Sequence, residues 1–261
     1  MALHKALAKF ILQQQKPCGK RTLVRSIKLE LIKLIIPKTK VDPNKINKTF
    51  YTRKLPHYQP LFRTFFITFC LKDAIPKGHL SKLYDEYKDR LKETDQIEDE
   101  TVKFELTTEL KFQYLITVDQ ILEKIQTGHH FLKNKEVARV VADSIKKYDN
   151  IYYNLICYTI MSNHVHMLID TSIQEEQIKS GQLAKPAYLD EILRLIKGAS
   201  SYLANKILNR NGQFWERESF DTIIHSDKYF NNSQAYILNN PVKANLVKSW
   251  MDYEFTYHYN K

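Results

Sequence analysis

A chain of 261 residues in which 43% of the side chains are hydrophobic is long enough to bury a core, which excludes a disordered protein. Its 40 lysines and arginines outnumber 29 acidic residues and give a net charge of +11, which favours a polyanionic partner, nucleic acid before an anionic membrane surface. Three cysteines without CxxC spacing, Cys18, Cys70 and Cys157, exclude a disulfide framework and a cysteine zinc site, and no apolar run is long enough to cross a bilayer.

Most of the positive charge lies at the start of the chain. Residues 1–60 hold 14 basic residues against two acidic ones, a net charge of +12, so the remaining residues sum to about −1. This asymmetry indicates either a region that grips phosphates or a solvated basic face. Apolar spacing predicts two short helices at 2–15 and 21–36, which fit a small DNA-binding unit and a helical hairpin packed on the main body equally well. The stretch from Pro37 to Pro60 is predicted to be a linker.

Beyond this linker, the hydrophobic periodicity predicts strands and helices of a folded domain. The predicted strands cover 61–71 and two stretches within 151–170. The predicted helices cover 79–93, 101–127, 134–148, 188–208 and 228–240. The helix at 134–148 is the most amphipathic, with Val137, Val140, Val141 and Ile145 on one face, and Pro241 is expected to stop the last helix.

The sharpest local motif is His164-Val165-His166, inside the second of the two apolar stretches at 151–170. Side chains alternate along a strand, so the two imidazoles point to one face while Val165 packs into the core on the other. Two adjacent imidazoles suit a divalent transition metal, and a site completed with oxygen ligands also accepts Mg²⁺. The motif alone is equally typical of an ordinary pair of core or surface histidines.

The surrounding sequence, YTIMSNHVHMLI at 158–169, resembles the HUH motif of the single-tyrosine HUH transposases. The family also includes the REP-associated tyrosine transposases and related insertion-sequence transposases. Further similar blocks lie on both sides of this motif, in the order of the family, at 53–71, 131–149, 196–208, 212–225 and 236–247. The resemblance covers about residues 52–261, so we expect two domains: a basic helical region at 1–51 and a transposase domain at 52–261.

The resemblance implies an α/β (α+β) fold. It has a central antiparallel sheet, flanking helices and a ferredoxin-like core. The resemblance also implies that Tyr236, four residues before the Asn240-Pro241 pair, is the nucleophile, and that Asn240 adds an oxygen ligand to His164 and His166 around Mg²⁺ or Mn²⁺. Independently of the family, Tyr236 and Asn240 are one turn apart on a predicted helix and can face one point. Two alternatives stay open: Tyr229 is the next candidate nucleophile, and Asn-Pro is also an ordinary signal for the end of a helix.

Several residues are candidates for DNA contacts. Phe214 and Trp215 can stack on unpaired bases, although a buried aromatic pair explains them equally well. The candidate phosphate contacts are Lys197, Arg217, Lys243, Arg21, Arg25, Arg53 and Lys54.

The function that the resemblance implies is metal-dependent cleavage and strand transfer of single-stranded, hairpin-flanked DNA through a 5′-phosphotyrosine. We therefore expect a prokaryotic, cytoplasmic, nucleoid-associated DNA transposition and recombination enzyme that does not bind membranes. Its relatives include dimers and monomers, so a homodimer is possible. One alternative is a domesticated hairpin-binding protein without catalysis. Another is a hydrolase unrelated to DNA, which needs an acid near the histidines, and Asp170 is the only acid close to them in sequence.

Overall fold

The structure is a computed structural model that describes residues 50–52, 56–125 and 127–260. The chain divides into two compact units, Met1–Ile46 and Asn47–Lys261, and every described residue belongs to the second. The helices predicted at 2–15 and 21–36 lie outside the described residues. So do four of the candidate phosphate contacts, Arg21, Arg25, Arg53 and Lys54. The predicted boundary after residue 51 stays a prediction.

The described chain is α+β, as predicted. Its α-helices are α3 (Lys77–Thr94), α4 (Glu100–Lys124), α5 (Lys135–Lys146), α6 (Ile173–Lys179), α7 (Leu189–Ile207) and α8 (Asp227–Lys243). Its strands are β1 (Phe50–Thr52), β2 (Pro56–Tyr58), β3 (Thr64–Cys70), β4 (Asn154–Ile160), β5 (His164–Asp170), β6 (Phe220–Ile223) and β7 (Thr256–His258). Two short 3-10 helices, Phe131–Lys133 and Trp250–Asp252, complete the described elements.

A five-stranded sheet in the order β6-β3-β5-β4-β7 forms the centre, and all its neighbouring strands are antiparallel. Without the edge strand β7, the chain order β3-α5-β4-β5-α7-β6 is a βαββαβ unit with its fourth strand beside its first. That is the ferredoxin-like arrangement that the resemblance to the HUH transposases implied. Strand β5 lies in the middle of the sheet, with a paired strand on each side, and all but its last residue are buried.

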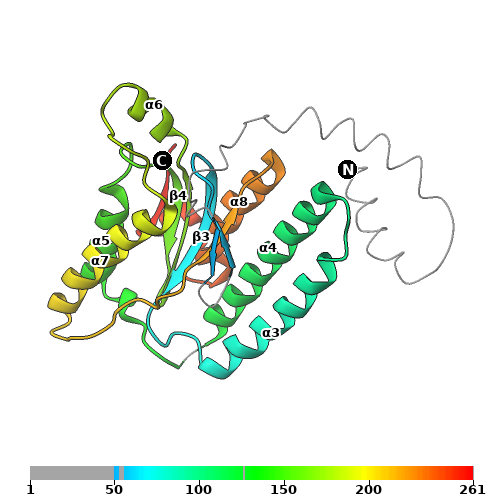
Figure 1. The fold of residues 1–261 in the computed structure, drawn as a ribbon. Helices are drawn as coiled ribbons and strands as arrows, with labels where there is room; N and C mark the ends of the chain where they lie inside the picture. The colour runs from blue at the N-terminus through cyan, green and yellow to red at the C-terminus, as the bar shows by residue number, and fades with distance from the viewer. Residues whose placement is uncertain (1–49, 53–55, 126, 261) are drawn as a thin grey trace. The chain divides into compact units, whose positions relative to one another are not determined.

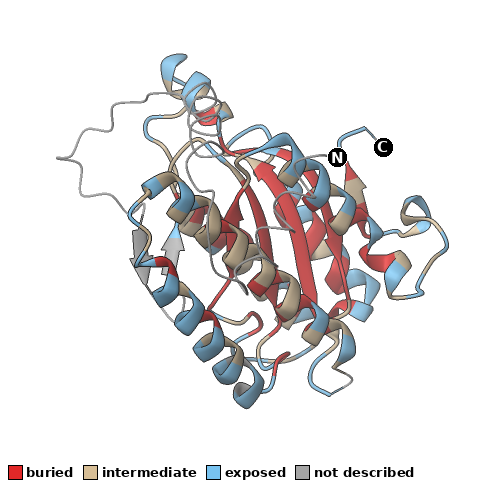
Figure 2. Cartoon of the chain, turned by 90° about the vertical axis from the view of Figure 1, so that its right-hand side faces the viewer, coloured by how far each residue is buried: buried red, intermediate tan, exposed pale blue. Residues whose placement is uncertain are grey.

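Helices cover both faces of this sheet (Figure 1). Helices α5 and α7 pack against each other on one side of the strands, whereas α4 and α8 lie on the other side. The strands between these layers are the most buried part of the domain (Figure 2). The α3–α4 hairpin is inserted in the crossover between β3 and α5, so it is an addition to the ferredoxin-like unit.

Two predictions of local structure were wrong. The stretch expected to be a linker up to Pro60 contains an antiparallel pair, β1 and β2, in which Phe50 lies opposite Tyr58. Each of these strands has only three residues, too few for a periodic pattern to show in the sequence. Pro241 does not stop the last helix, because α8 continues to Lys243 and ends at the cap residue Ala244. A proline inside a helix removes one hydrogen bond, and the packing of α8 against β4 and β5 compensates for the loss.

None of the helices in the described part of the chain is both long enough and apolar enough to cross a membrane.

The register of α5 makes a testable prediction about the core. Val141 is fully buried, whereas its neighbour Val140 is half-buried, so the predicted apolar face is correct except at its edge. We expect Val141→Ala to lower the free energy of unfolding by about 2 kcal/mol, because two buried methyl groups are removed and a cavity remains. Val140→Ala should lower the free energy of unfolding by less than half as much. Urea denaturation with unchanged m values measures both, and equal losses would contradict this register.

Candidate active site

Strand β5 carries both histidines of the motif on the face that α4 and α8 cover. His164 lies opposite Cys70 of β3, and His166 lies opposite Thr68. Their rings are 4.7 Å apart, and the side chains are 1% and 0% exposed. The period-two alternation of the strand thus brings the two imidazoles together, as the sequence predicted, while Val165 is buried on the opposite face.

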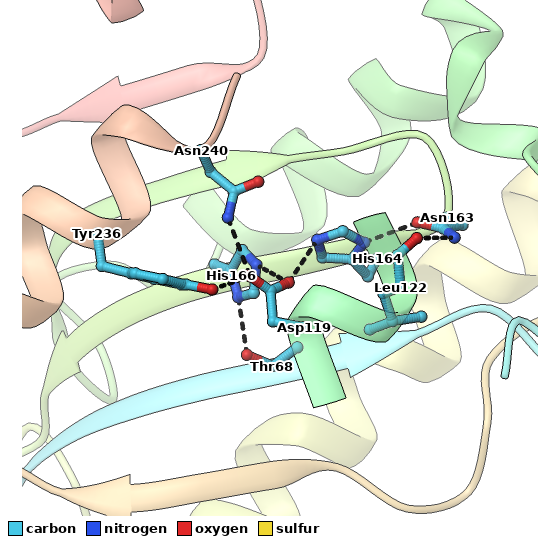
Figure 3. A network of polar contacts seen from close by, with 8 residues as sticks. All are labelled: Thr68, Asp119, Leu122, Asn163, His164, His166, Tyr236 and Asn240. Atoms are coloured by element: carbon cyan, nitrogen blue, oxygen red, sulfur yellow. Dashed lines mark hydrogen bonds and ion pairs between the residues drawn. The ribbon is translucent and has the colours of Figure 1, made fainter. Parts of the chain in front are cut away.

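A carboxylate that the sequence analysis did not single out lies between the two imidazoles. Asp119 of α4 is 1% exposed, and its Oδ1 atom is 2.8 Å from Nε2 of His166 and 3.0 Å from Nε2 of His164 (Figure 3). Its only sequence signal is an acid inside the apolar run LITVDQIL, next to the core positions Leu115, Val118 and Leu122. An acid on the buried side of a helix is unusual and needs a partner, but the sequence does not say which one.

Two polar contacts hold the middle of the long helix α4 in place. Lys111 reaches the buried Asp221 of β6 at 3.5 Å, and the hydroxyl of Tyr229 on α8 donates to Glu109. These contacts fix α4 against the sheet and against α8, so the position of Asp119 ten residues further along is determined by the fold.

The other nitrogen of each imidazole has its own partner. Nδ1 of His164 lies 2.7 Å from Oδ1 of Asn163, whose amide nitrogen donates to the carbonyl of Leu122 at 3.1 Å. That donation orients the amide, so its oxygen accepts a hydrogen bond from the Nδ1–H group of His164, and the lone pair of the neutral ring is on Nε2. Nδ1 of His166 lies 2.7 Å from Oγ1 of Thr68. Both rings therefore turn Nε2 towards Asp119.

Helix α8 brings the predicted nucleophile to the same carboxylate. The hydroxyl of Tyr236 donates to Oδ2 of Asp119, and the amide nitrogen of Asn240 lies 3.2 Å from the same oxygen (Figure 3). The spacing of one helical turn thus places both residues at one point. The amide oxygen of Asn240 is buried and has no hydrogen-bond partner among the described residues, so in this orientation the nitrogen, not the predicted ligand oxygen, faces the cluster.

The charges of the cluster are coupled. Burial raises the pKa of the Asp119 carboxyl, but the charge of His166 and the close contacts with both imidazoles outweigh burial and hold the pKa well below its usual range. Burial lowers the pKa of His164, which keeps this ring neutral at neutral pH. Burial, reinforced by the charge of Asp119 and the hydrogen bond to it, raises the pKa of Tyr236, so the phenol stays protonated.

The donor atoms fit a divalent cation. Nε2 of His164, Nε2 of His166 and a carboxylate oxygen of Asp119 lie within 4.8 Å of one another. Nε2 of His164 makes no hydrogen bond to a described residue, so its lone pair meets a carboxylate oxygen across 3.0 Å. Two such groups repel each other unless a proton or a cation lies between them. Two imidazoles and a carboxylate suit Mn²⁺ or Zn²⁺, and Mg²⁺ where further oxygens complete the shell.

The remaining candidate residues do not all face this cluster. Phe214 and Trp215 are buried, and Trp215 donates to Ser200 at 2.9 Å, so the described structure shows the aromatic packing alternative. Lys197 donates to the carbonyl of Arg217 at 3.2 Å and to Ser219, so it holds the chain before β6. Arg217 itself is exposed.

Lys243 is the candidate cation that lies beside the cluster. Its Nζ atom is 4.1 Å from the centre of the Tyr236 ring, and the lysine is exposed. It therefore places a positive charge beside the ring of the predicted nucleophile.

Comparisons with known proteins add one structural likeness. No protein-family model matches the sequence, and no curated protein matches it. Among solved structures, the chain is similar to a REP-associated tyrosine transposase bound to a REP hairpin, with 14% sequence identity, a TM-score of 0.41, and coverage of 79% of this chain and 80% of that chain.

The cluster makes a prediction that does not depend on any activity. We expect Mn²⁺ to raise the melting temperature of the protein by several degrees, because a cation that binds the folded state stabilises it by mass action. Asp119→Ala and His164→Ala should each remove most of this shift. Asp170→Ala is the matched control, since Asp170 lies on the same strand but bonds Thr64 and Ser172, and it should keep the full shift. A full shift in Asp119→Ala would show that this carboxylate does not bind the metal.

Proposed function

We propose that this protein cleaves and rejoins single-stranded DNA with Tyr236 as the nucleophile, His164, His166 and Asp119 as ligands of a divalent metal, and a 5′-phosphotyrosine as the intermediate. One observation carries the proposal: the phenol of Tyr236 and the two imidazoles meet on a single buried carboxylate. The chain has 16 tyrosines, and Tyr236 is the one whose hydroxyl donates to the carboxylate that also contacts both histidines.

The chain's own residues position the reacting groups. The phenol oxygen of Tyr236 attacks the phosphorus, the bond from phosphorus to the 3′ oxygen breaks, and the 3′ oxygen leaves with a proton as a hydroxyl. A second 3′ hydroxyl reverses the step and joins strands, because the phosphotyrosine bond conserves the energy of the phosphodiester. Asp119 orients the phenol before attack, and Thr68 and Asn163 hold the two imidazoles. A bound divalent metal would supply charge stabilisation at the phosphate oxygens.

The charge of the chain supports a nucleic-acid substrate. The first 60 residues carry a net charge of +12, and Lys243 lies beside the proposed nucleophile. The sequence resembles single-tyrosine transposases, and the similar solved structure is of a transposase bound to a REP hairpin. We therefore extend the proposal to hairpin-flanked DNA as the substrate, with Mg²⁺ or Mn²⁺ as the metal and Asn240 as a further ligand once its amide turns over.

A second candidate function has one observation in its favour. Asp170, the only acid close to the histidines in sequence, lies at the end of β5 and bonds Thr64 and Ser172, whereas Asp119 places a carboxylate beside the histidines. A metal-dependent hydrolase that activates water would use the same three ligands. The two functions differ in one product, because only the transferase leaves the substrate covalently attached to the protein.

The decisive experiment is to trap that covalent product. We expect a labelled hairpin oligonucleotide with a single-stranded flank, incubated with the protein and Mn²⁺, to form an adduct that survives denaturing electrophoresis. Tyr236→Phe should abolish the adduct, because the attacking oxygen is gone. Tyr229→Phe is the matched control: Tyr229 is on the same helix and its hydroxyl also donates to a carboxylate of α4, but it lies away from the histidines. An adduct in Tyr236→Phe would reject Tyr236, and cleavage without any adduct would favour the hydrolase.

Lys243 makes a separate prediction about the substrate phosphate. We expect Lys243→Gln to raise the DNA concentration needed for half-maximal adduct formation several-fold, because the exposed cation beside Tyr236 is lost. The rate at saturating DNA should change less. Lys248→Gln, at an exposed lysine in the loop after α8, serves as the control. A Lys243 variant with unchanged concentration dependence would show that this lysine does not contact the substrate.

A further inference from the structure

A second recognition feature lies at the end of helix α7. A hollow of about 350 Å³ is lined by Tyr202, Asn205, Lys206, Asn209, Arg210, Asn211 and Gly212. It opens to solvent and contains none of the residues of the metal and tyrosine cluster. Its lining combines an aromatic ring, two cations and three amides, the types of group that bind a nucleobase and its phosphate.

The aromatic wall is unusually accessible. Tyr202 is 71% exposed, the highest value among the large hydrophobic and aromatic side chains of the described residues. Most of the aromatic rings of the domain pack in the core or on each other, so a solvated ring beside a hollow has no role in folding that the structure shows. A ring of this kind offers its face for stacking, which is tolerant of base identity.

The floor of the hollow is held rigidly. Oδ1 of Asn205 accepts from the guanidinium of Arg210 at 3.0 Å, and the amide nitrogen of Asn205 donates to the carbonyl of Gly212 at 2.9 Å. Arg210 also lies over the ring of Phe131 at 4.7 Å. Gly212 has a φ of 93°, a backbone conformation that other residues rarely adopt, and this allows the loop to turn back on α7. The hollow is therefore formed before any ligand arrives.

The amides and the remaining cation of the hollow are available to a ligand. Within the part of the chain that the structure describes, the side chains of Asn209, Asn211 and Lys206 make no hydrogen bond or ion pair. An amide pairs with the edge of a base by donating and accepting at once, and a lysine binds a phosphate as a point charge. Stacking, edge recognition and phosphate binding are thus offered together.

Packed residues connect the hollow with the turn before β5. Arg210 of the hollow stacks on Phe131, and His130, the residue before Phe131, reaches Oγ of Ser162 at 2.8 Å. Ser162 is two residues before His164. Helix α7 and helix α8 cover opposite faces of the sheet, so a strand of nucleic acid that contacts both the hollow and Tyr236 passes around the sheet.

We infer that the hollow at the end of α7 binds one nucleotide of single-stranded DNA, with its base stacked on Tyr202, its edge read by Asn209 and Asn211, and its phosphate held by Lys206. This inference rests on the proposed function for its substrate class, and it adds a second point of contact with the DNA, outside the active site.

The first experiment measures binding without cleavage. Fluorescence anisotropy with a labelled single-stranded oligonucleotide in the presence of a chelator reports affinity for the full chain. We expect Tyr202→Ala to weaken binding about tenfold, in the range that loss of one stacked base produces, and Tyr202→Phe to retain most of the affinity. Tyr259→Ala is the matched control, because Tyr259 is also exposed, at 58%, but follows β7 and does not line the hollow. Equal affinities for Tyr202→Ala and the wild type would overturn the inference.

A second experiment locates the base directly. An oligonucleotide carrying 5-iododeoxyuridine should crosslink to Tyr202 on irradiation, and mass spectrometry identifies the attached peptide. A crosslink confined to other residues would overturn the inference. So would a duplex or an RNA of the same sequence that competes with the labelled oligonucleotide more strongly than unlabelled single-stranded DNA does. The inference and the proposed function can fail separately. If Tyr236→Phe loses the adduct but Tyr202→Ala binds DNA fully, the role of the hollow alone is rejected. If the protein binds no DNA at all, both are rejected.

Discussion

One buried carboxylate connects the three elements on which the candidate active site depends. Asp119 of α4 touches both imidazoles of β5 with one oxygen, and the phenol and amide of α8 with the other. A buried charge without partners costs several kcal/mol, and these four contacts offset the cost of burying the carboxylate and its polar partners. The same pairing that makes the charge tolerable also fixes the distance between the imidazoles and the phenol. The site is thus a consequence of satisfying one acid inside the domain.

The position of this acid follows from how the domain is built. The ferredoxin-like unit uses α5 and α7 to cover one face of the sheet and would leave the other face open. The α3–α4 hairpin and α8 cover this second face, and the histidines of β5 point towards it. The chemistry therefore lies between the ferredoxin-like unit and two elements added to it. Because α4 precedes β5 in the chain and α8 follows it, the site forms only after the whole domain has folded.

The sequence predicted the parts of this site that depend on local periodicity. The pairing of His164 with His166 follows from strand alternation, and the pairing of Tyr236 with Asn240 follows from helical spacing. Asp119 is 47 residues from His166 and shares no motif with it, so no local pattern could connect them. The short strands β1, β2, β6 and β7 were missed for a related reason. Strands of three or four residues acquire their structure from their neighbours in the sheet, which a linear pattern does not contain.

Pro241 inside α8 has a mechanical consequence for the site. A residue with an amide hydrogen at this position would donate to the carbonyl of Ile237, and the proline cannot. The missing bond belongs to the same turn that presents Tyr236 and Asn240, between a first half of the helix tied to α4 by Tyr229 and a last turn that ends in Lys243. The helix therefore bends most easily beside the phenol, and the direction of its side chain can change there without unwinding the rest of α8.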